Sequence, residues 1–258
     1  MRQPFRNLAR DAWHVFAELV LPRVCVACDR LMPANAQSMA CGSCLARLVQ
    51  LPYPRCERCG HPAGPLSCRW CPMLPDFVRA VRSCCWVPGG VAERLIYAFK
   101  YEGWYTLNED LAERMARLQW PDDVRAECAA LIPVPLAVDR RRERGFNQSE
   151  LLADALGRRM GWPVCARVLQ RVRATPSQTR LTPEQRLRNV DGAFRIVERL
   201  PESLLGAHVI LVDDVITTAA TLNECAVTLW DAGVRIISYV SFGRARAAGD
   251  LPLTRGSA

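Results

Sequence analysis

The residues best suited to do chemistry gather in one short stretch near the end of the chain. Two adjacent carboxylates, Asp213 and Asp214, directly follow a continuous apolar run over 208–212. Such a run is typical of a central strand in a parallel sheet, and ligands of open α/β sheets bind where those strands end. Small and hydroxyl residues then lead into a helical pattern, and they are Thr217, Thr218, Ala219, Ala220 and Thr221.

This composition suits an anion with a diol beside it. Backbone N–H groups in the turn and at the helix N-terminus bind phosphate, and threonine hydroxyls add donors. The two aspartates suit ribose hydroxyls or a divalent cation. Together these features predict a site for ribose 5-phosphate. The alternative is a solvated strand end with a threonine-rich helix cap. Neither G-x-x-x-x-G-K-[ST] nor G-x-G-x-x-G occurs, which argues against P-loop and Rossmann sites.

Eight of the 13 cysteines form four pairs with two residues between partners. Two such turns supply four thiolates to one zinc ion at ~2.3 Å, in a tetrahedron with no open position for catalysis. Four pairs therefore predict two structural Zn²⁺ ions. Neighbouring pairs are expected to share a site, although the spacing leaves interleaved pairing open. The predicted ligands are Cys25, Cys28, Cys41, Cys44, Cys56, Cys59, Cys68 and Cys71.

The remaining cysteines and histidines do not extend this metal pattern. His61 stands near Cys59, but no thiolate is missing from the sets, so we leave it out. His14, His61 and His208 form no convincing acid–base set. The other cysteines lack partner spacing and are interpreted as small buried hydrophobes, and they are Cys84, Cys85, Cys128, Cys165 and Cys225.

The composition is that of a globular protein, with 50% hydrophobic and 23% charged residues. A net charge of +8 favours anionic partners such as nucleic acid or phosphates. Arginine-rich codon usage would give the same charge, since Lys100 is the single lysine. We find no secretory signal and no apolar run long enough to span a membrane. A reducing cytoplasmic location is expected, where paired cysteines indicate metal sites.

Alternating helical and strand patterns over 80–245 predict the α/β domain that positions the acid pair. An amphipathic helix over 1–24 and the cysteine module over 25–75 precede it, and a frayed tail over 246–258 follows. The predicted strands cover 130–133, 208–212 and 234–242. The predicted helices cover 91–100, 107–118, 147–160 and 221–232, the third capped by Asn147 and stopped by Gly161.

Residues 209–221 resemble the phosphoribosyl pyrophosphate (PRPP) motif of type I phosphoribosyltransferases. The resemblance extends over nearly the whole chain to the ComF family of competence-associated proteins. It implies a parallel sheet of the type I phosphoribosyltransferase kind, flanked by helices and preceded by a double zinc ribbon. Besides the cysteine pairs, the blocks that carry it are Leu95-Ile-Tyr-Ala-Phe-Lys100-Tyr101, Ile132–Pro135, Arg142–Gln148, 173–178 and 188–194.

The same resemblance implies a role for each block. Asp213 and Asp214 would hold the ribose hydroxyls, and residues 217–221 would wrap the 5-phosphate. The turn Pro133, Val134 and Pro135 would face pyrophosphate, and residues 140–148 would form a mobile loop. One residue departs from the motif, because Ala219 stands where glycine is usual. Alanine would weaken phosphate binding there, unless its φ is negative.

Phosphoribosyl transfer from PRPP with Mg²⁺ requires cations that stabilise the departing pyrophosphate. Arg144, with Arg142, and Lys100 are the candidates, although ordinary exposed basic residues would look the same. The sequence leaves three functions open. One is transfer to an unidentified acceptor base, and the second is a non-catalytic adaptor that binds nucleotide or single-stranded DNA alongside DNA-uptake proteins. The third is a basic zinc ribbon that binds nucleic acid beside a relic domain.

Overall fold

The structure is a computed structural model that describes residues 22–63, 68, 70–87, 89–173 and 191–246. The predicted N-terminal helix lies almost entirely outside the described residues, as do the tail after residue 246 and the block 188–190. Among the described residues, no helix has the length and apolar character to cross a membrane.

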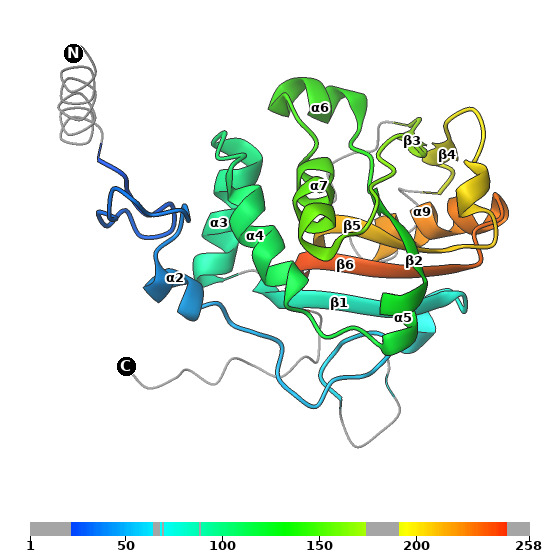
Figure 1. The fold of residues 1–258 in the computed structure, drawn as a ribbon, viewed down its shortest axis with the longest axis horizontal. Helices are drawn as coiled ribbons and strands as arrows, with labels where there is room; N and C mark the ends of the chain where they lie inside the picture. Colours follow the sequence, from blue (N-terminus) through cyan, green and yellow to red (C-terminus); the bar gives the residue numbers. More distant parts are fainter. Residues whose placement is uncertain (1–21, 64–67, 69, 88, 174–190, 247–258) are drawn as a thin grey trace, which may run out of the picture.

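Four parallel strands form the central sheet in the order β1-β6-β5-β2 (Figure 1). The three predicted strands are confirmed, although β2 and β5 are longer than expected and β6 begins two residues later and ends three residues later than predicted. A fourth strand, β1, was not predicted, because Arg79, Arg82 and Ser83 interrupt its apolar pattern. Arg82 is nevertheless buried, and its guanidinium donates to the carbonyl of Gln119 at 2.7 Å. The strands are β1 (Val78–Val87), β2 (Cys128–Pro133), β5 (His208–Ile216) and β6 (Ile236–Ala245).

Helices cover both faces of this sheet, as Figure 1 shows. Helices α3 (Gly90–Tyr101), α4 (Leu107–Ala116) and α7 (Gln148–Met160) pack on one face. Helix α9 (Ala220–Asp231) packs on the other. Side chains alternate along a strand, so Ile210 of β5 lies in the first core and Leu211 in the second.

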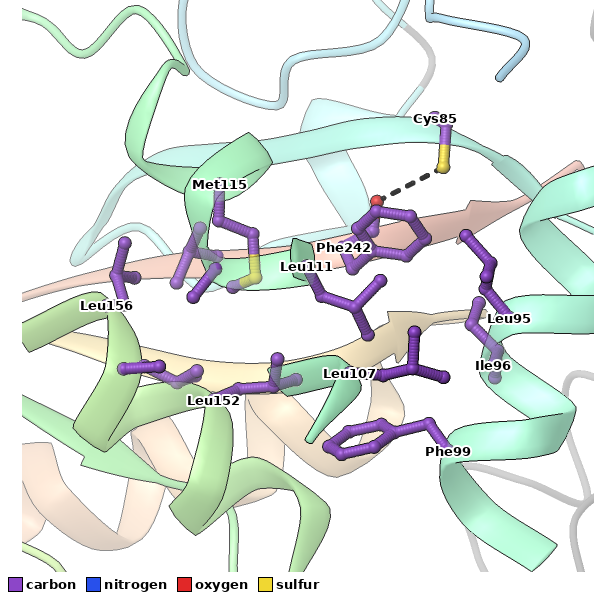
Figure 2. Packing of buried hydrophobic residues seen from close by; sticks show 14 of the residues in the cluster. Cys85, Leu95, Ile96, Phe99, Leu107, Leu111, Met115, Leu152, Leu156 and Phe242 are labelled. Atoms are coloured by element: carbon purple, nitrogen blue, oxygen red, sulfur yellow. Dashed lines mark hydrogen bonds between the residues drawn. The ribbon is translucent and has the colours of Figure 1, made fainter. Parts of the chain in front are cut away.

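The first core is built largely from leucine and phenylalanine side chains of the three helices (Figure 2). Leu107, Leu111 and Leu152 meet Phe99 and Phe242 there, all at most 1% exposed. Helix α7 begins as predicted, because the Asn147 side chain accepts from the amide of Ser149 at 3.0 Å. It ends at Gly161, whose φ of 70° is left-handed.

Smaller elements complete the fold. An antiparallel hairpin of β3 and β4 lies apart from the main sheet. The remaining elements are α2 (Gly42–Ala46), α5 (Asp122–Glu127), α6 (Val138–Arg144), β3 (Leu169–Arg171), β4 (Phe194–Ile196) and the 3₁₀ turns η1 (Cys71–Met73) and η3 (Glu202–Leu204).

The two halves of the cysteine module pack on opposite faces of the sheet. We call residues 22–48 the first Cys segment and residues 54–74 the second. Val26 and Leu48 of the first segment join the core under α3 and α4. The amide of Met39 also donates to the buried Asp110 of α4 at 2.7 Å. Leu74 of the second segment joins the core under α9.

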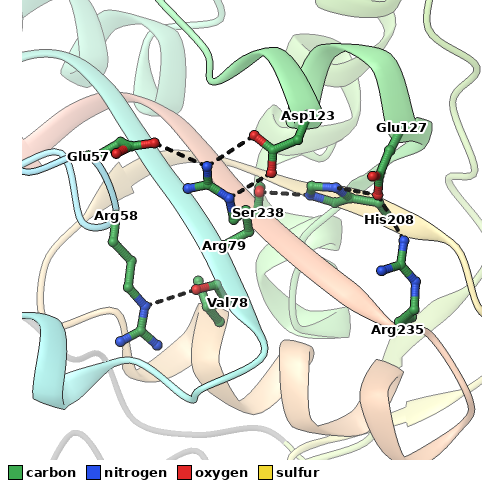
Figure 3. A network of polar contacts seen from close by, with 9 residues as sticks. All are labelled: Glu57, Arg58, Val78, Arg79, Asp123, Glu127, His208, Arg235 and Ser238. Atoms are coloured by element: carbon green, nitrogen blue, oxygen red, sulfur yellow. Dashed lines mark hydrogen bonds and ion pairs between the residues drawn. The ribbon is translucent and has the colours of Figure 1, made fainter.

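The second Cys segment is also bonded directly to strand β1 (Figure 3). Arg79 of β1 bridges Glu57 at 3.1 Å and Asp123 of α5 at 2.6 Å. Arg58 donates from Nε to the carbonyl of Val78 at 3.0 Å. Gly60 takes a φ of +69°, and a Cβ there would collide with the carbonyl oxygen of Val81. The close approach of this turn to β1 explains the need for glycine at position 60.

Candidate functional site

The acid pair lies within the last residues of β5, because the strand continues to Ile216. The two side chains therefore point to different partners. Asp214 is buried, with 3% of its surface exposed, and its carboxylate forms an ion pair with the ammonium of Lys100 on α3. Asp213 accepts at Oδ1 from the hydroxyl of Ser149 at 3.0 Å and from the amide of Asp214 at 2.9 Å.

These surroundings separate the pKa values of the two acids. The pKa of Asp213 is raised to about 7. Burial is the largest cause, and the negative charge of Asp214 raises the pKa more than the positive charge of Lys100 lowers it. Burial acts in the same direction on Asp214, but the charge and the hydrogen bond of Lys100 outweigh it, so the pKa of Asp214 lies below its usual value. Asp214 is thus ionised at neutral pH, and Lys100 is what keeps it so.

The turn after the acids presents a helix N-terminus with little capping. Helix α9 begins at Ala220 and has 12 residues, and Ala219 precedes it without a side-chain cap. Thr218 reaches the amide of Ala220 only at 3.5 Å, the outer limit of a hydrogen bond. Thr217 is exposed and Thr218 is half-buried. First-turn amides and the positive end of the helix dipole make this a place for an anion.

Ala219 adopts a left-handed conformation, with φ 59° and ψ 4°. The negative φ that would make alanine harmless here is not what the structure shows. A left-handed alanine costs about 1–2 kcal/mol, because its Cβ crowds the following carbonyl. The turn therefore keeps the geometry of a glycine motif although it lacks the glycine.

The predicted pyrophosphate-facing turn lies beside the end of β5. The amide of Val134 donates to the carbonyl of Val212 at 3.0 Å, and its own carbonyl accepts from the side chain of Asn147 at 3.1 Å. Pro133 and Pro135 have no N–H to donate. This turn consequently shapes one wall of the site, and donors to an anion must come from other residues.

The segment predicted as a mobile loop is partly helical, which corrects that expectation. Residues Val138–Arg144 form α6, and Gly145 ends it with a left-handed φ of 80°. Arginine is a good helix former, and four arginines within five residues, with Asp139 in the first turn, favour this helix over a loop. Arg142 on this helix is exposed.

Arg144 stands at the C-terminal end of α6 and faces α3. Its guanidinium donates to Gln148 at 2.9 Å and to the hydroxyl of Tyr101 at 3.2 Å, and lies 4.9 Å from the centre of the Tyr101 ring. The positive charge of Arg144 also lowers the pKa of Asp214, although less than Lys100 does. Of the three predicted cations, the structure thus places Lys100 in contact with the acid pair and Arg144 close enough for its charge to act on Asp214, whereas Arg142 is exposed.

Two further residues belong to this site that the sequence did not single out. Ser149 positions Asp213 through the hydrogen bond from its hydroxyl. It is the second residue after the Asn147 cap, so it lies in the first turn of α7. Tyr101 positions Arg144. Tyr101 directly follows Lys100 in a block already noted, but nothing in the spacing shows that residues 101 and 144 meet.

The predicted metal ligands form two separate groups of four. In each group the sulfur atoms lie within 4.8 Å of one another, and the groups combine neighbouring pairs, as expected. Distances of 3.8 Å between Cys28 and Cys41 sulfurs and 3.4 Å between Cys56 and Cys71 sulfurs fit one tetrahedral zinc per group, for which ~2.3 Å bonds imply sulfurs about 3.8 Å apart. His61 instead stacks on Trp70 at 4.5 Å.

The five other cysteines lie outside both groups. Cys85 and Cys225 are buried, whereas Cys84, Cys128 and Cys165 are half-buried. The expectation of full burial therefore holds for only two of them.

Comparison with known proteins agrees with this arrangement. A double zinc ribbon domain model matches residues 16–74, and a phosphoribosyl transferase domain model matches residues 133–252. DNA utilization protein YhgH of Salmonella typhi is 33% identical over 229 residues, covering 85% of this chain and 96% of its own length. The chain belongs to the ComF family.

Other relatives carry names of the same kind. Competence protein F of Haemophilus influenzae is 31% identical and covers 81% of this chain and 92% of itself. Competence protein ComFC of Bacillus subtilis is 25% identical, with coverage of 81% and 90%. A solved hypoxanthine phosphoribosyltransferase of Staphylococcus aureus overlays 58% of this chain and 76% of its own at 12% identity and TM-score 0.33, which is too loose to assign any residue. The family match makes the two cysteine groups structural zinc sites of a double ribbon.

The zinc sites predict a specific metal stoichiometry. The full chain should contain two zinc ions, and Cys59→Ser should lower this to about one, because three thiolates hold zinc weakly. The loss should also destabilise the protein, since the second Cys segment is bonded to β1. Metal analysis by mass spectrometry measures the ratio. Cys165→Ser, outside both groups, should retain two ions, and a Cys59→Ser protein that also keeps two would contradict the assignment.

The left-handed Ala219 predicts an unusual stabilising substitution. Ala219→Gly should raise the free energy of unfolding by up to about 1 kcal/mol, because the relief of strain exceeds the entropy that glycine adds to the unfolded chain. Urea unfolding measures the change. Ala126→Gly on the exposed face of α5 should instead destabilise by roughly 0.5–1 kcal/mol. Equal losses for both variants would show that residue 219 is not strained.

Proposed function

We propose that this chain binds PRPP with Mg²⁺ at the end of β5 and transfers the phosphoribosyl group to a nucleobase-like acceptor. One observation carries the proposal: an acid pair, in which the buried Asp214 has its own counter-ion, precedes a helix N-terminus that lacks a side-chain cap. Membership of the ComF family and the phosphoribosyl transferase domain match support it.

The two ends of the sugar phosphate would be held by different parts of the turn. Asp213 and Asp214 would accept hydrogen bonds from the ribose hydroxyls. Lys100 would keep Asp214 ionised and therefore a strong acceptor. The amides of residues 218–221 would point at the 5-phosphate, with the hydroxyl of Thr218 beside them. Held at both ends, the sugar would present its anomeric carbon to the acceptor in a fixed orientation.

The site also suits magnesium carried on the substrate. Mg²⁺ prefers one or two carboxylates together with phosphate oxygens and water. Lys100 is already paired with Asp214, and Ser149 already donates to Asp213. PRPP itself would therefore supply most of the oxygen ligands of the magnesium ion. Bound magnesium would neutralise charge on the departing pyrophosphate.

Arg144 is placed to add positive charge on the same side of the site. Its guanidinium is held by Gln148 and Tyr101 at a distance at which it still acts on Asp214. Exchange of these neutral partners for pyrophosphate oxygens would gain a charge-assisted hydrogen bond. Gly145, immediately after α6, would allow that movement.

A second candidate function is a non-catalytic adaptor that binds single-stranded DNA. Three exposed tyrosines favour it, namely Tyr97, Tyr101 and Tyr105, which are 53%, 55% and 58% exposed. The rings of Tyr97 and Tyr101 lie 5.2 Å apart, and Arg144 lies against the second. Exposed aromatic rings beside arginine bind single strands by stacking and charge. The relatives' names, competence protein and DNA utilization protein, agree with such a role.

Thermal unfolding with and without PRPP and Mg²⁺ tests the first proposal. Ligand at one hundred times its Kd stabilises by about 2.7 kcal/mol, which corresponds to several degrees in Tm. The wild type should show this shift, and Asp213→Asn with Asp214→Asn should lose it. Asp213→Asn alone, which leaves the Lys100 ion pair in place, should reduce it.

The matched control is Asp154→Asn with Asp231→Asn, which changes two exposed acids and should keep the shift. No shift in the wild type, or an equal shift in the acid-pair variant, would refute PRPP binding at this site. Release of pyrophosphate, screened across nucleobases, then separates the two functions. Release that depends on a base supports transfer, whereas binding without release with any base supports the adaptor.

A further inference from the structure

A pocket lies where the residues between the two Cys segments meet β1, and its lining includes none of the residues of the site on β5. The link between the two Cys segments pairs with this strand, since the carbonyl of Val49 accepts from the amide of Trp86 at 2.8 Å and Gln50 bridges Cys85. A pocket of about 190 Å³ opens between this link, the strand and the end of α4. Its lining includes Gln50, Tyr53, Arg55, Cys84, Arg114 and Arg117.

Three arginines give this pocket a strongly positive lining. Arg117 is ion-paired with the exposed Glu113, and Arg55 donates to the carbonyl of Leu51. Arg114 is half-buried, and among the described residues its guanidinium has no hydrogen-bond or ion-pair partner. None of the described residues that line the pocket is acidic. A half-buried guanidinium without a protein counter-ion is available to bind an anion, and its planar donors suit a phosphate.

Two of these arginines line the pocket together with Cys84. The charges of Arg114 and Arg55 both act on the thiol of Cys84, although burial dominates and raises the pKa of that thiol well above its usual value. Arg114 of α4 and Arg55 of the second Cys segment thus line the same small pocket from distant parts of the sequence. Two or three guanidiniums around one small cavity are the arrangement that binds phosphate oxygens.

An aromatic ring stands beside this charged pocket. Tyr53 is 68% exposed, and the guanidinium of Arg55 lies 4.1 Å from the centre of its ring. One face of the ring is thus held by Arg55, and the exposed remainder of the ring is available for stacking. Aromatic rings beside phosphate-binding arginines are typical of sites for nucleotides.

The size of the pocket limits what it encloses. Pockets that enclose a whole small molecule usually measure about 300–1,000 Å³, so 190 Å³ holds only one end of a ligand. We infer that this pocket is a second anion site, separate from the site on β5, which encloses the phosphate of a nucleotide while the base stacks on Tyr53. A free nucleotide and the phosphorylated end of a nucleic-acid strand both offer that chemistry.

Calorimetric titration with adenosine 5′-monophosphate tests this inference. The full zinc-loaded chain is used with Asp213→Asn and Asp214→Asn in place, so that the two acids at β5 no longer hold the ribose hydroxyls. We expect one binding event. Arg114→Gln should weaken it about tenfold or more, because a charge-assisted contact is lost. Tyr53→Ala should weaken it several-fold, and adenosine without phosphate should not bind detectably.

Arg167→Gln provides the matched control, because Arg167 is an exposed arginine that does not line this pocket. Its affinity should equal that of the parent protein. A 5′-phosphorylated oligonucleotide that displaces the monophosphate would assign the pocket to strand ends, and failure to displace it would assign the pocket to free nucleotides. The inference would be overturned if the monophosphate did not bind. It would also be overturned if Arg114→Gln and Tyr53→Ala bound the monophosphate with the same affinity as the parent protein.

Discussion

The ion pair between Lys100 and Asp214 is the interaction on which the rest of the site depends. Two neighbouring carboxylates at a buried strand end repel each other, and each loses its hydration. Removal of one partner from a buried pair costs roughly 3–5 kcal/mol, because an uncompensated charge remains. Lys100 therefore ties α3 to the end of β5, and it is the one lysine of a chain that otherwise uses arginine. A compact ammonium suits this confined position better than a planar guanidinium.

The zinc ribbons connect metal binding to the same sheet. Each Cys segment contributes to a different core, so segments whose folding depends on zinc stabilise the cores on both faces of the sheet. Arg58 bonds the second segment to β1, the edge strand of the sheet, because its carbonyl accepts from the amide of Val81 at 2.7 Å, and Gly60 allows this close approach. Zinc binding thus stabilises an edge strand that would otherwise lack a partner on its outer side.

Much of this architecture could be predicted from sequence, for physical reasons. The strand His208–Ile216 is buried on both faces and so appears as an apolar run, and α7 carries its own cap and stop. The cysteine pairs set the metal groups through local spacing alone. Strand β1 was missed because Arg82 is buried by means of a partner, the carbonyl of Gln119, that lies 37 residues away. Contacts of that kind depend on tertiary structure, and no local pattern encodes them.

The residues of the site likewise divide into features that local sequence predicts and contacts that only the tertiary structure shows. The acids, threonines and basic residues were visible as types, but their pairings were not, because Lys100 and Asp214 are 114 positions apart. The left-handed φ of Ala219 was equally hidden, since alanine is rarely found there. Helix α6 stands where the family resemblance implied a loop, because its four arginines have a high helix propensity.

The most direct measurement is an NMR titration of the ¹⁵N-labelled chain with PRPP and Mg²⁺, followed at the backbone amides. Saturating shifts should be largest at residues 218–221, where the first-turn amides would meet the 5-phosphate, and smaller at surface amides of α5. Shifts that leave residues 218–221 unchanged while PRPP binds would contradict the account, because the phosphate would then lie elsewhere.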